Sequence, residues 1–336
     1  MINGRLSPPV RLTWLRLALG LALALAGIYV LALSFDWETV PAALAQANAT
    51  LITAALASVV LVIIAKAGRW RLFFAASAPL SLAHLLRALA IGMLANLLLP
   101  LRLGEVARVY ALQQQTGLRK TTALSTLVAE KTLDLLVLVF ASLALLPAFL
   151  LPQDLLGNAL GLIGLTAALL AGLILLARHA DRVSGWLAPW FGRLPTRLGR
   201  RLEQLVLAGL DGLQTLRQAR RLAALILASM GILVLSVLTP WFLFKAFGLP
   251  FGLGEALALN LAVTIGSAPP STPGKLVVFE ALTLLALGYF GLDKPAMGLS
   301  YALTFHLVAI LPPILLGSAA AARLHFRLPL ALKQIG

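Results

Sequence analysis

This chain of 336 residues is 60% hydrophobic and only 12% charged. Its mean hydropathy of +0.96 excludes an ordinary soluble globular domain. The absence of cysteine excludes disulfides and thiolate metal sites. The sequence therefore predicts an all-α polytopic membrane protein, with a single transmembrane domain over residues 1–336.

Six apolar windows are long enough to cross the roughly 30 Å hydrocarbon core of a bilayer as helices. They are residues 14–35, 42–65, 121–151, 155–177, 222–244 and 295–322. The first window follows several basic residues but has no clear small-residue cleavage pattern. We therefore interpret it as a retained helix rather than a signal peptide.

Positive charge is unevenly distributed along the chain. Most of the 27 lysines and arginines fall in residues 1–16, 66–71, 87–120, 178–221 and 323–336. The positive-inside rule places these segments and both termini in the cytoplasm, with the protein in the plasma (inner) membrane. The net charge of +15 then reflects this asymmetry and contact with anionic lipids, and we predict no nucleic-acid partner.

Residues 178–221 form the longest of the basic segments. Trp186, Trp190 and Phe191 lie among its arginines. This pattern is typical of an amphipathic helix lying in the membrane interface. We predict a cytoplasmic basic amphipathic linker between two halves of the chain.

Two breaks interrupt the helical pattern inside apolar sequence. Residues 88–101 are apolar but form a segment too short to span the membrane. Pro100 lies at the end of this segment, and Gly104 follows three residues after the segment. Residues 266–274 read GSAPPSTPG, whose three prolines exclude a continuous helix. From the charge distribution, each break lies in a segment that begins and ends on one side of the membrane. Both are therefore predicted to be re-entrant hairpins.

The two breaks occupy corresponding places in two repeats, residues 42–151 and 222–322, which enter the membrane from opposite sides. In secondary transporters this inverted arrangement places a substrate site near the bilayer midplane. The alternative is that residues 81–101 and 275–292 simply span, which gives eight helices and no symmetry.

Ionisable residues near the first break are candidate substrate-binding groups, because charge is costly in lipid. Arg102 and Arg108 carry guanidinium groups that match the planar geometry of phosphate, and Asn96 and Glu105 lie in the same motif. Alternatively, Glu105 and Arg108 are three residues apart and form an internal pair on one helix face.

Glu130 and Asp134 lie four residues apart inside the third window, so they share one helix face. A structural interpretation is that they bind Arg102 or Arg108 and hold the first hairpin. A functional interpretation is a proton-linked site or a site for a headgroup amine.

The second break carries Pro273, Gly274, Lys275 and Glu280. A helix amino terminus after Gly274, strengthened by Lys275, suits an anion such as a lipid phosphate. Alternatively, Lys275 extends to the membrane interface. Glu280 is expected to pair internally, and His306 to be a hydrogen-bonded core histidine. No cluster has metal-ligand spacing, so neither a metal nor another cofactor is predicted.

The ordered set NLLLPLRLGE, EKTLD and PPSTPGKLVVFE resembles the flippase-like integral membrane family that includes the transmembrane domain of lysylphosphatidylglycerol synthases. The resemblance covers residues 14–324. It implicates the motif residues Asn96, Pro100, Arg102, Gly104, Glu105, Glu130, Asp134, Pro273, Gly274 and Glu280. Three positions depart from the family's usual residues: Lys131 stands in place of Arg, Lys275 in place of Gly, and His306 in place of Arg. Because His306 is in the final helix, a permanent cation there does not carry over from the family.

The soluble aminoacyl-transferase domain of those synthases has no counterpart after Arg323, so the resemblance implies lipid translocation rather than aminoacylation. We predict a flippase or scramblase for a phosphate-bearing lipid, with membrane lipids as partners. Two alternatives remain: a membrane-embedded glycosyltransferase or other lipid-modifying enzyme, and a non-catalytic partner subunit of an envelope-lipid pathway. We find no acidic pair suited to a metal-bound nucleotide donor, which favours a transporter over an enzyme.

Overall fold

The computed structural model describes residues 39–74, 80–99, 103–149, 178–192, 218–268 and 273–326, with isolated residues between 172 and 207. The regular elements in these ranges are all helical, which confirms the all-α prediction. The predicted span 14–35, nearly all of 155–177, and much of the linker 178–221 lie outside the described residues. Pro100 and Arg102 lie outside them as well.

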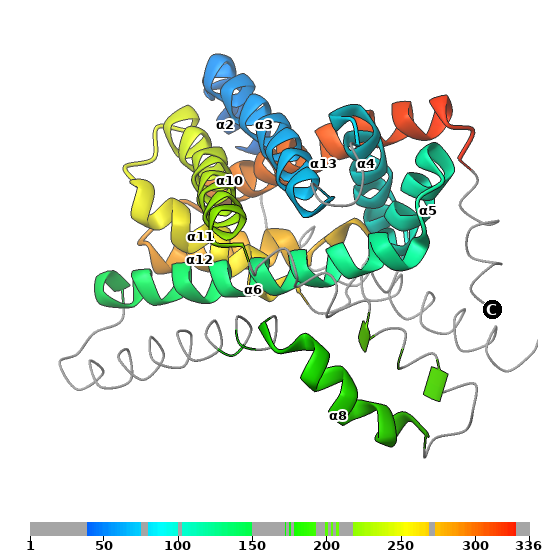
Figure 1. Cartoon of the computed structure of the whole chain (residues 1–336). Helices are drawn as coiled ribbons and strands as arrows, with labels where there is room; N and C mark the ends of the chain where they lie inside the picture. Colours follow the sequence, from blue (N-terminus) through cyan, green and yellow to red (C-terminus); the bar gives the residue numbers. More distant parts are fainter. Residues whose placement is uncertain are drawn as a thin grey trace, which may run out of the picture.

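Three long helices, α3 (Ala49–Phe74), α10 (Ala219–Ala246) and α13 (Pro295–Arg323), form the centre of the fold (Figure 1). Within the described residues, these three are long and apolar enough to cross a membrane. α3 packs along α10, and α13 contacts both. The other helical elements are α2 (Thr39–Ala45), α4 (Leu82–Leu98), α5 (Gly104–Thr116), α6 (Lys120–Phe149), α8 (Ala180–Gly192), α11 (Leu253–Gly266), the 3₁₀ turn η4 (Pro273–Lys275) and α12 (Val278–Tyr289).

The predicted window 42–65 was wrong at both ends. The chain turns after α2, and the Asn48 side chain accepts a hydrogen bond from the Leu51 amide at 3.2 Å, which starts a new helix. At the other end, α3 continues through the basic residues 66–71 as far as Phe74. The helix continues because Trp70, Phe73 and Phe74 are buried in the core on the same side of it.

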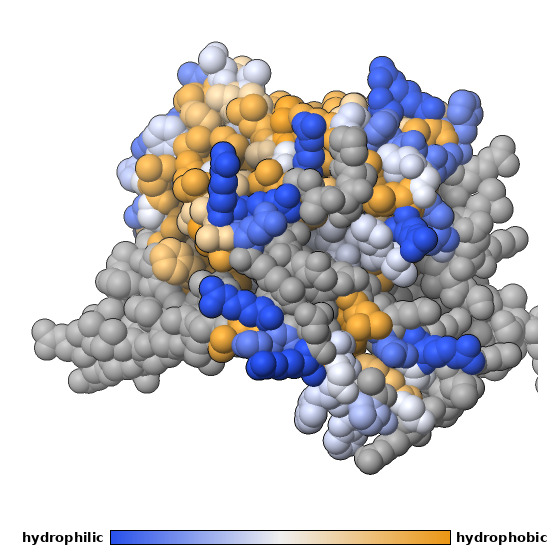
Figure 2. All heavy atoms as spheres, viewed as in Figure 1, coloured by the Kyte–Doolittle hydropathy of each residue, from blue (hydrophilic) through white to orange (hydrophobic). Residues whose placement is uncertain are grey.

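The outer faces of the long helices are apolar. Leu61 on α3 and Leu227 and Val234 on α10 are exposed large hydrophobic side chains, the last two to 72% and 59%. Figure 2 shows hydrophobic residues over this part of the molecule and hydrophilic residues at the ends of α4 and α5. A lipid-facing surface has this character, because hydrocarbon surrounds it in place of water.

Both predicted breaks are present. The first separates α4, which ends at Leu98, from α5, which begins at Gly104, and the second separates α11 from α12. η4, inside the second break, lies against α4. Segments from the two halves of the chain therefore meet, although about 170 residues separate them in sequence. Whether either hairpin re-enters the membrane stays a prediction.

Glycines allow the helices around the first break to approach closely. A Cβ on Gly92 of α4 would lie 2.9 Å from the Gly104 carbonyl oxygen of α5. A Cβ on Gly317 of α13 would lie 2.6 Å from the Leu94 Cβ and 2.7 Å from the Ala90 oxygen of α4. Small residues at such crossings let backbones pack in direct contact, as in other membrane helix pairs.

The helix α8 lies within the predicted linker 178–221. Trp186 and Trp190 point outward, with exposed fractions of 67% and 56%. In Figure 1, α8 lies below α6 and apart from the three central helices. Its predicted position in the membrane interface stays a prediction.

Candidate functional site

Four ionisable side chains from three helices meet inside the fold, and we call them the charge cluster. They are Arg69 of α3, Arg108 of α5, and Glu130 and Asp134 of α6. Arg69, Arg108 and Glu130 are almost fully buried, while the Asp134 side chain is 39% exposed. The cluster is therefore closed on the side of α5 and open beside Asp134.

Arg108 and Glu130 form a two-pronged ion pair. Nη1 donates to Oε1 at 3.1 Å and Nη2 donates to Oε2 at 2.9 Å. The guanidinium carbon also lies 3.5 Å from the centre of the Trp70 ring, which stacks against it. Trp70 in turn donates its indole hydrogen to the Thr126 hydroxyl of α6 at 3.0 Å. These contacts hold the Arg108 plane in one orientation.

Arg69 joins a fourth helix to the cluster. Its Nη1 donates to the Ser229 hydroxyl of α10 at 2.9 Å. Its Nη2 lies 2.6 Å from Asp134 Oδ1 and 3.7 Å from Glu130 Oε1. Arg69 therefore connects α3, α6 and α10, and both carboxylates of α6 share its charge.

Three further charged groups surround the cluster. Glu105 of α5 binds Lys131 of α6 at 2.9 Å and lies 3.9 Å from Arg108. Lys66 of α3 interacts electrostatically with Asp134, Lys131 and Arg69. Lys66, Arg69, Arg108 and Lys131 thus face the three carboxylates of Glu105, Glu130 and Asp134. The three cations that form ion pairs here, Arg69, Arg108 and Lys131, balance these three carboxylates.

Three guanidinium nitrogens in the cluster are buried and have no hydrogen-bond partner among the described residues: Nε of Arg69, Nη2 of Arg69 and Nε of Arg108. Of these, Arg69 Nη2 is within ion-pair distance of Asp134, so the two Nε groups have neither kind of contact. Buried donors in proteins are nearly always paired, with protein, water or ligand. The cluster therefore has guanidinium donors left over for a further acceptor.

The sequence identified part of this cluster correctly. Glu130 does bind Arg108, and the predicted pair of Glu105 with Arg108 exists at 3.9 Å, although each has a closer partner. Asp134 binds Arg69, and no ion pair joins it to Arg108; Arg102, the other partner offered by the structural interpretation, lies outside the described residues. Because residues 66–71 were interpreted as a basic segment at the membrane surface, Arg69 was missed. The signal that could have revealed it is the continuation of the apolar helix pattern past it.

Asn96 has a structural position at the first break. Its Oδ1 accepts a hydrogen bond at 2.8 Å from the amide of Gly104, the first residue of α5. Asn96 therefore caps α5 from the neighbouring helix α4, because Leu103 at the N-cap supplies no side-chain acceptor.

Asn96→Ala is expected to lower the free energy of unfolding by about 1 kcal/mol, since it leaves the Gly104 amide without its acceptor. Asn96→Asp keeps an acceptor in place and is the matched control, with a smaller expected loss. Unfolding of the purified variants in detergent would measure both. An Ala variant as stable as the wild type would show that Asn96 does not cap α5.

At the second break, Glu280 pairs internally, as expected. Its Oε1 lies 2.6 Å from Nδ1 of His306 in α13, and Nε2 of His306 lies 2.9 Å from the Gly274 carbonyl oxygen. The prediction that His306 is a hydrogen-bonded core residue fits this geometry. Lys275 donates to the Ser267 hydroxyl at 2.9 Å. The α12 amino terminus already carries the Glu280 carboxylate in its first turn.

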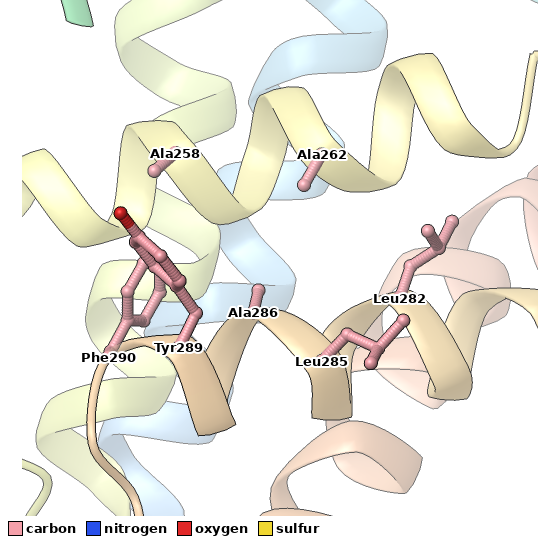
Figure 3. Close-up of a pocket in the computed structure, with 7 residues that line it drawn as sticks. All are labelled: Ala258, Ala262, Leu282, Leu285, Ala286, Tyr289 and Phe290. Atoms are coloured by element: carbon pink, nitrogen blue, oxygen red, sulfur yellow. The ribbon is translucent and has the colours of Figure 1, made fainter. Parts of the chain in front are cut away.

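A separate apolar groove of about 330 Å³ lies between α11 and α12. Figure 3 shows Ala258 and Ala262 of α11 facing Leu282, Leu285 and Ala286 of α12, with two aromatic rings at one end. The rings are those of Tyr289 and Phe290. Because no charged side chain lines it, this groove cannot recognise a headgroup by charge. The charge cluster is therefore the candidate headgroup site.

Within the described residues, no group of three or more His, Asp or Glu side chains is placed to hold a metal ion. The charge cluster and the three charged groups around it offer ion-pairing chemistry: two guanidinium groups, two ammonium groups and three carboxylates. Within the described residues, this site contains no nucleophile activated by a base.

Comparison with known proteins identifies a membrane-protein family. The family model described as the lysylphosphatidylglycerol synthase TM region matches residues 17–317. A UPF0104 membrane protein of Methanothermobacter thermautotrophicus is 24% identical over 224 residues, which are 62% of this chain and 66% of that protein. No solved structure matches. Because the family model matches most of the chain, this multi-pass membrane protein belongs to the family of the lysylphosphatidylglycerol synthase TM region.

Proposed function

We propose that this protein is a transporter of flippase or scramblase type, which moves a phosphate-bearing lipid between membrane leaflets. The charge cluster is its headgroup site. The observation that carries the proposal is the pair of buried guanidinium groups, each with an unused Nε hydrogen, inside a bundle of apolar helices. Ionisable groups at such positions mark substrate pathways in membrane proteins.

The chemistry of the cluster suits a phosphate. A guanidinium group presents several N–H donors in one plane, which matches the oxygens of a phosphate. The two unused Nε hydrogens supply donors without breaking the Arg108–Glu130 pair.

The route to the cluster passes Asp134. This carboxylate is 39% exposed and holds the Nη2 of Arg69, while Glu130 is 4% exposed and holds Arg108 through two hydrogen bonds. A phosphate arriving from the lipid side therefore competes with Asp134 for Arg69. In this mechanism Asp134 exchanges with the headgroup, and Glu130 keeps Arg108 oriented.

The two breaks supply a path between leaflets. We propose that α4 with α5 and α11 with α12 are re-entrant hairpins of inverted repeats 42–151 and 222–322, and that they meet where η4 lies against α4. The repeats alternate the exposure of a site at their interface. The positive-inside pattern supports a location in the inner membrane with both termini in the cytoplasm.

The test is lipid movement in reconstituted vesicles of phosphatidylethanolamine and phosphatidylglycerol, followed with a fluorescent phospholipid. Arg69→Lys keeps the charge but loses the planar fork, and is expected to slow movement by about 10- to 100-fold, as for a charged hydrogen bond of about 1.5–3 kcal/mol. Arg119→Lys changes an exposed arginine and is the control. Lipid movement that is absent in the wild type, or unchanged in Arg69→Lys, would contradict the proposal.

A further inference from the structure

The contacts of His306 require a count of protons. Its Nε2 lies 2.9 Å from the carbonyl oxygen of Gly274, and its Nδ1 lies 2.6 Å from Oε1 of Glu280. A carbonyl oxygen only accepts hydrogen bonds, so Nε2 carries a hydrogen. A second proton lies between Nδ1 and Oε1, either on the imidazole or on the carboxyl group. With both contacts formed, the pair therefore holds two protons.

Loss of one of these protons is incompatible with the observed geometry. A neutral imidazole beside an ionised Glu280 has one N–H and one lone pair. If the hydrogen stays on Nε2, the lone pair of Nδ1 faces a carboxylate oxygen. If it moves to Nδ1, the lone pair of Nε2 faces the Gly274 oxygen. In either case one of the two contacts of His306 becomes repulsive and opens.

The backbone next to Gly274 is strained and relies on its surroundings. Lys275 has φ +60°, and Val277 has φ +72° with ψ −45°, which a β-branched residue rarely adopts. The His306–Gly274 contact ties this segment to α13. Phe279 stacks on the His306 ring at 4.5 Å between centroids, which fixes the plane of the imidazole. Opening of the contact therefore frees a segment that is already strained.

We propose that Glu280 and His306 form a proton-binding site, whose shared proton ties the break between α11 and α12 to α13. With the proton bound, the break is held against α13. When the proton leaves, the tie opens and the break changes conformation. This inference goes beyond the proposed lipid transport and does not depend on it, because it concerns the conformation of the break alone.

The other charged groups near this pair have separate partners or positions. Lys275, on the break itself, donates to Ser267 of α11. On α11, Glu255 lies in the first turn, at the end opposite the break. Tyr301 of α13 donates its hydroxyl hydrogen to the Pro240 carbonyl oxygen at 3.1 Å, and Tyr289 lies in the last turn of α12. The remaining titratable groups on the helical elements packed against the break or α12 are His84 and Arg87 in the first turns of α4 and Arg323 at the end of α13. Among the described residues, His306 is the side chain that acts electrostatically on Glu280.

The experiment uses the full-length chain in lipid nanodiscs. Because the chain contains no cysteine, Leu276→Cys gives a single labelling position on the break for an environment-sensitive fluorophore. Emission is recorded between about pH 5 and pH 9, the range that includes the usual histidine titration. We expect one sigmoidal transition in which the ratio of the two emission states changes about tenfold per pH unit, as for one proton.

Two variants carried on this labelled background test the assignment. Glu280→Gln supplies an amide that turns to donate to Nδ1, so both His306 contacts persist without the extra proton, and the transition is expected to vanish. Glu255→Gln removes a carboxylate that binds the Gly252 amide at 2.9 Å, and is expected to keep the transition. The proposal would be overturned if the labelled Leu276→Cys protein showed no fluorescence transition with pH, or if the transition persisted in Glu280→Gln. His306→Gln, which is also expected to be insensitive to pH, serves where the Glu280 variant does not fold.

Discussion

Arg108→Met is expected to lower the free energy of unfolding by about 3–5 kcal/mol, the usual cost of removing one partner from a buried ion pair. The reason is that Glu130 is almost fully buried and receives two hydrogen bonds from Arg108. Without them the carboxylate stays in the core, with Arg69 at 3.7 Å as its nearest remaining cation. Unfolding in mixed detergent micelles, followed by circular dichroism, would measure the loss.

A double variant distinguishes the loss of the ion pair from the cost of leaving Glu130 buried without its partner. Arg108→Met with Glu130→Met replaces both partners by apolar groups, and is expected to be more stable than Arg108→Met alone. The matched control is Lys131→Met, which breaks the partly exposed pair with Glu105 and is expected to cost no more than about 1 kcal/mol. If Arg108→Met and Lys131→Met had equal effects, the buried pair would not stabilise the fold.

Gly104→Ala is expected to destabilise the protein by about 3 kcal/mol or more, at or beyond the upper end of ordinary overpacking. A Cβ at Gly104 would overlap the carbonyl oxygen of Gly92 and the side chain of Asn96. The Gly92 oxygen belongs to the backbone of α4, so it moves only if the whole helix moves. The same displacement would pull Asn96 away from the Gly104 amide, and α5 would lose its cap.

Gly68→Ala provides the control for this prediction. Gly68 lies within α3, and a Cβ there would meet nothing within 4 Å. Alanine is a better helix former than glycine by about 1 kcal/mol, so this variant is expected to be as stable as the wild type or more so. Thermal unfolding of both variants in detergent would decide the matter. An unchanged unfolding temperature for Gly104→Ala would mean that α4 and α5 separate easily at this contact.

Several features followed from the sequence because they depend on local chemistry. The prolines of 266–274 remove helical hydrogen bonds wherever they occur, so the second break was predictable. Glu130 and Asp134 share a helix face through their spacing alone. In the same way, long apolar windows predicted α10 and α13 within a few residues of their observed ends. Membrane helices depend strongly on such local signals, because hydrocarbon offers no other partner for the backbone.

The identity of each ionic partner required the tertiary structure. Nothing in the sequence distinguished among several arginines as the partner of Asp134, and the partner proved to be Arg69, about 65 residues earlier in the chain. The proton-holding contact of Glu280 with His306 likewise depends on how α12 packs against α13.

The sequence by itself determined that this is an all-helical membrane protein, where its two Pro- and Gly-containing breaks lie, and which residue types are too polar for lipid. Only the tertiary structure decided which of those residues meet. Composition and helical period act within a few turns of one helix, whereas the distance between two charges on different helices depends on how those helices cross. In this protein the crossings are set by glycines such as Gly92, Gly104 and Gly317.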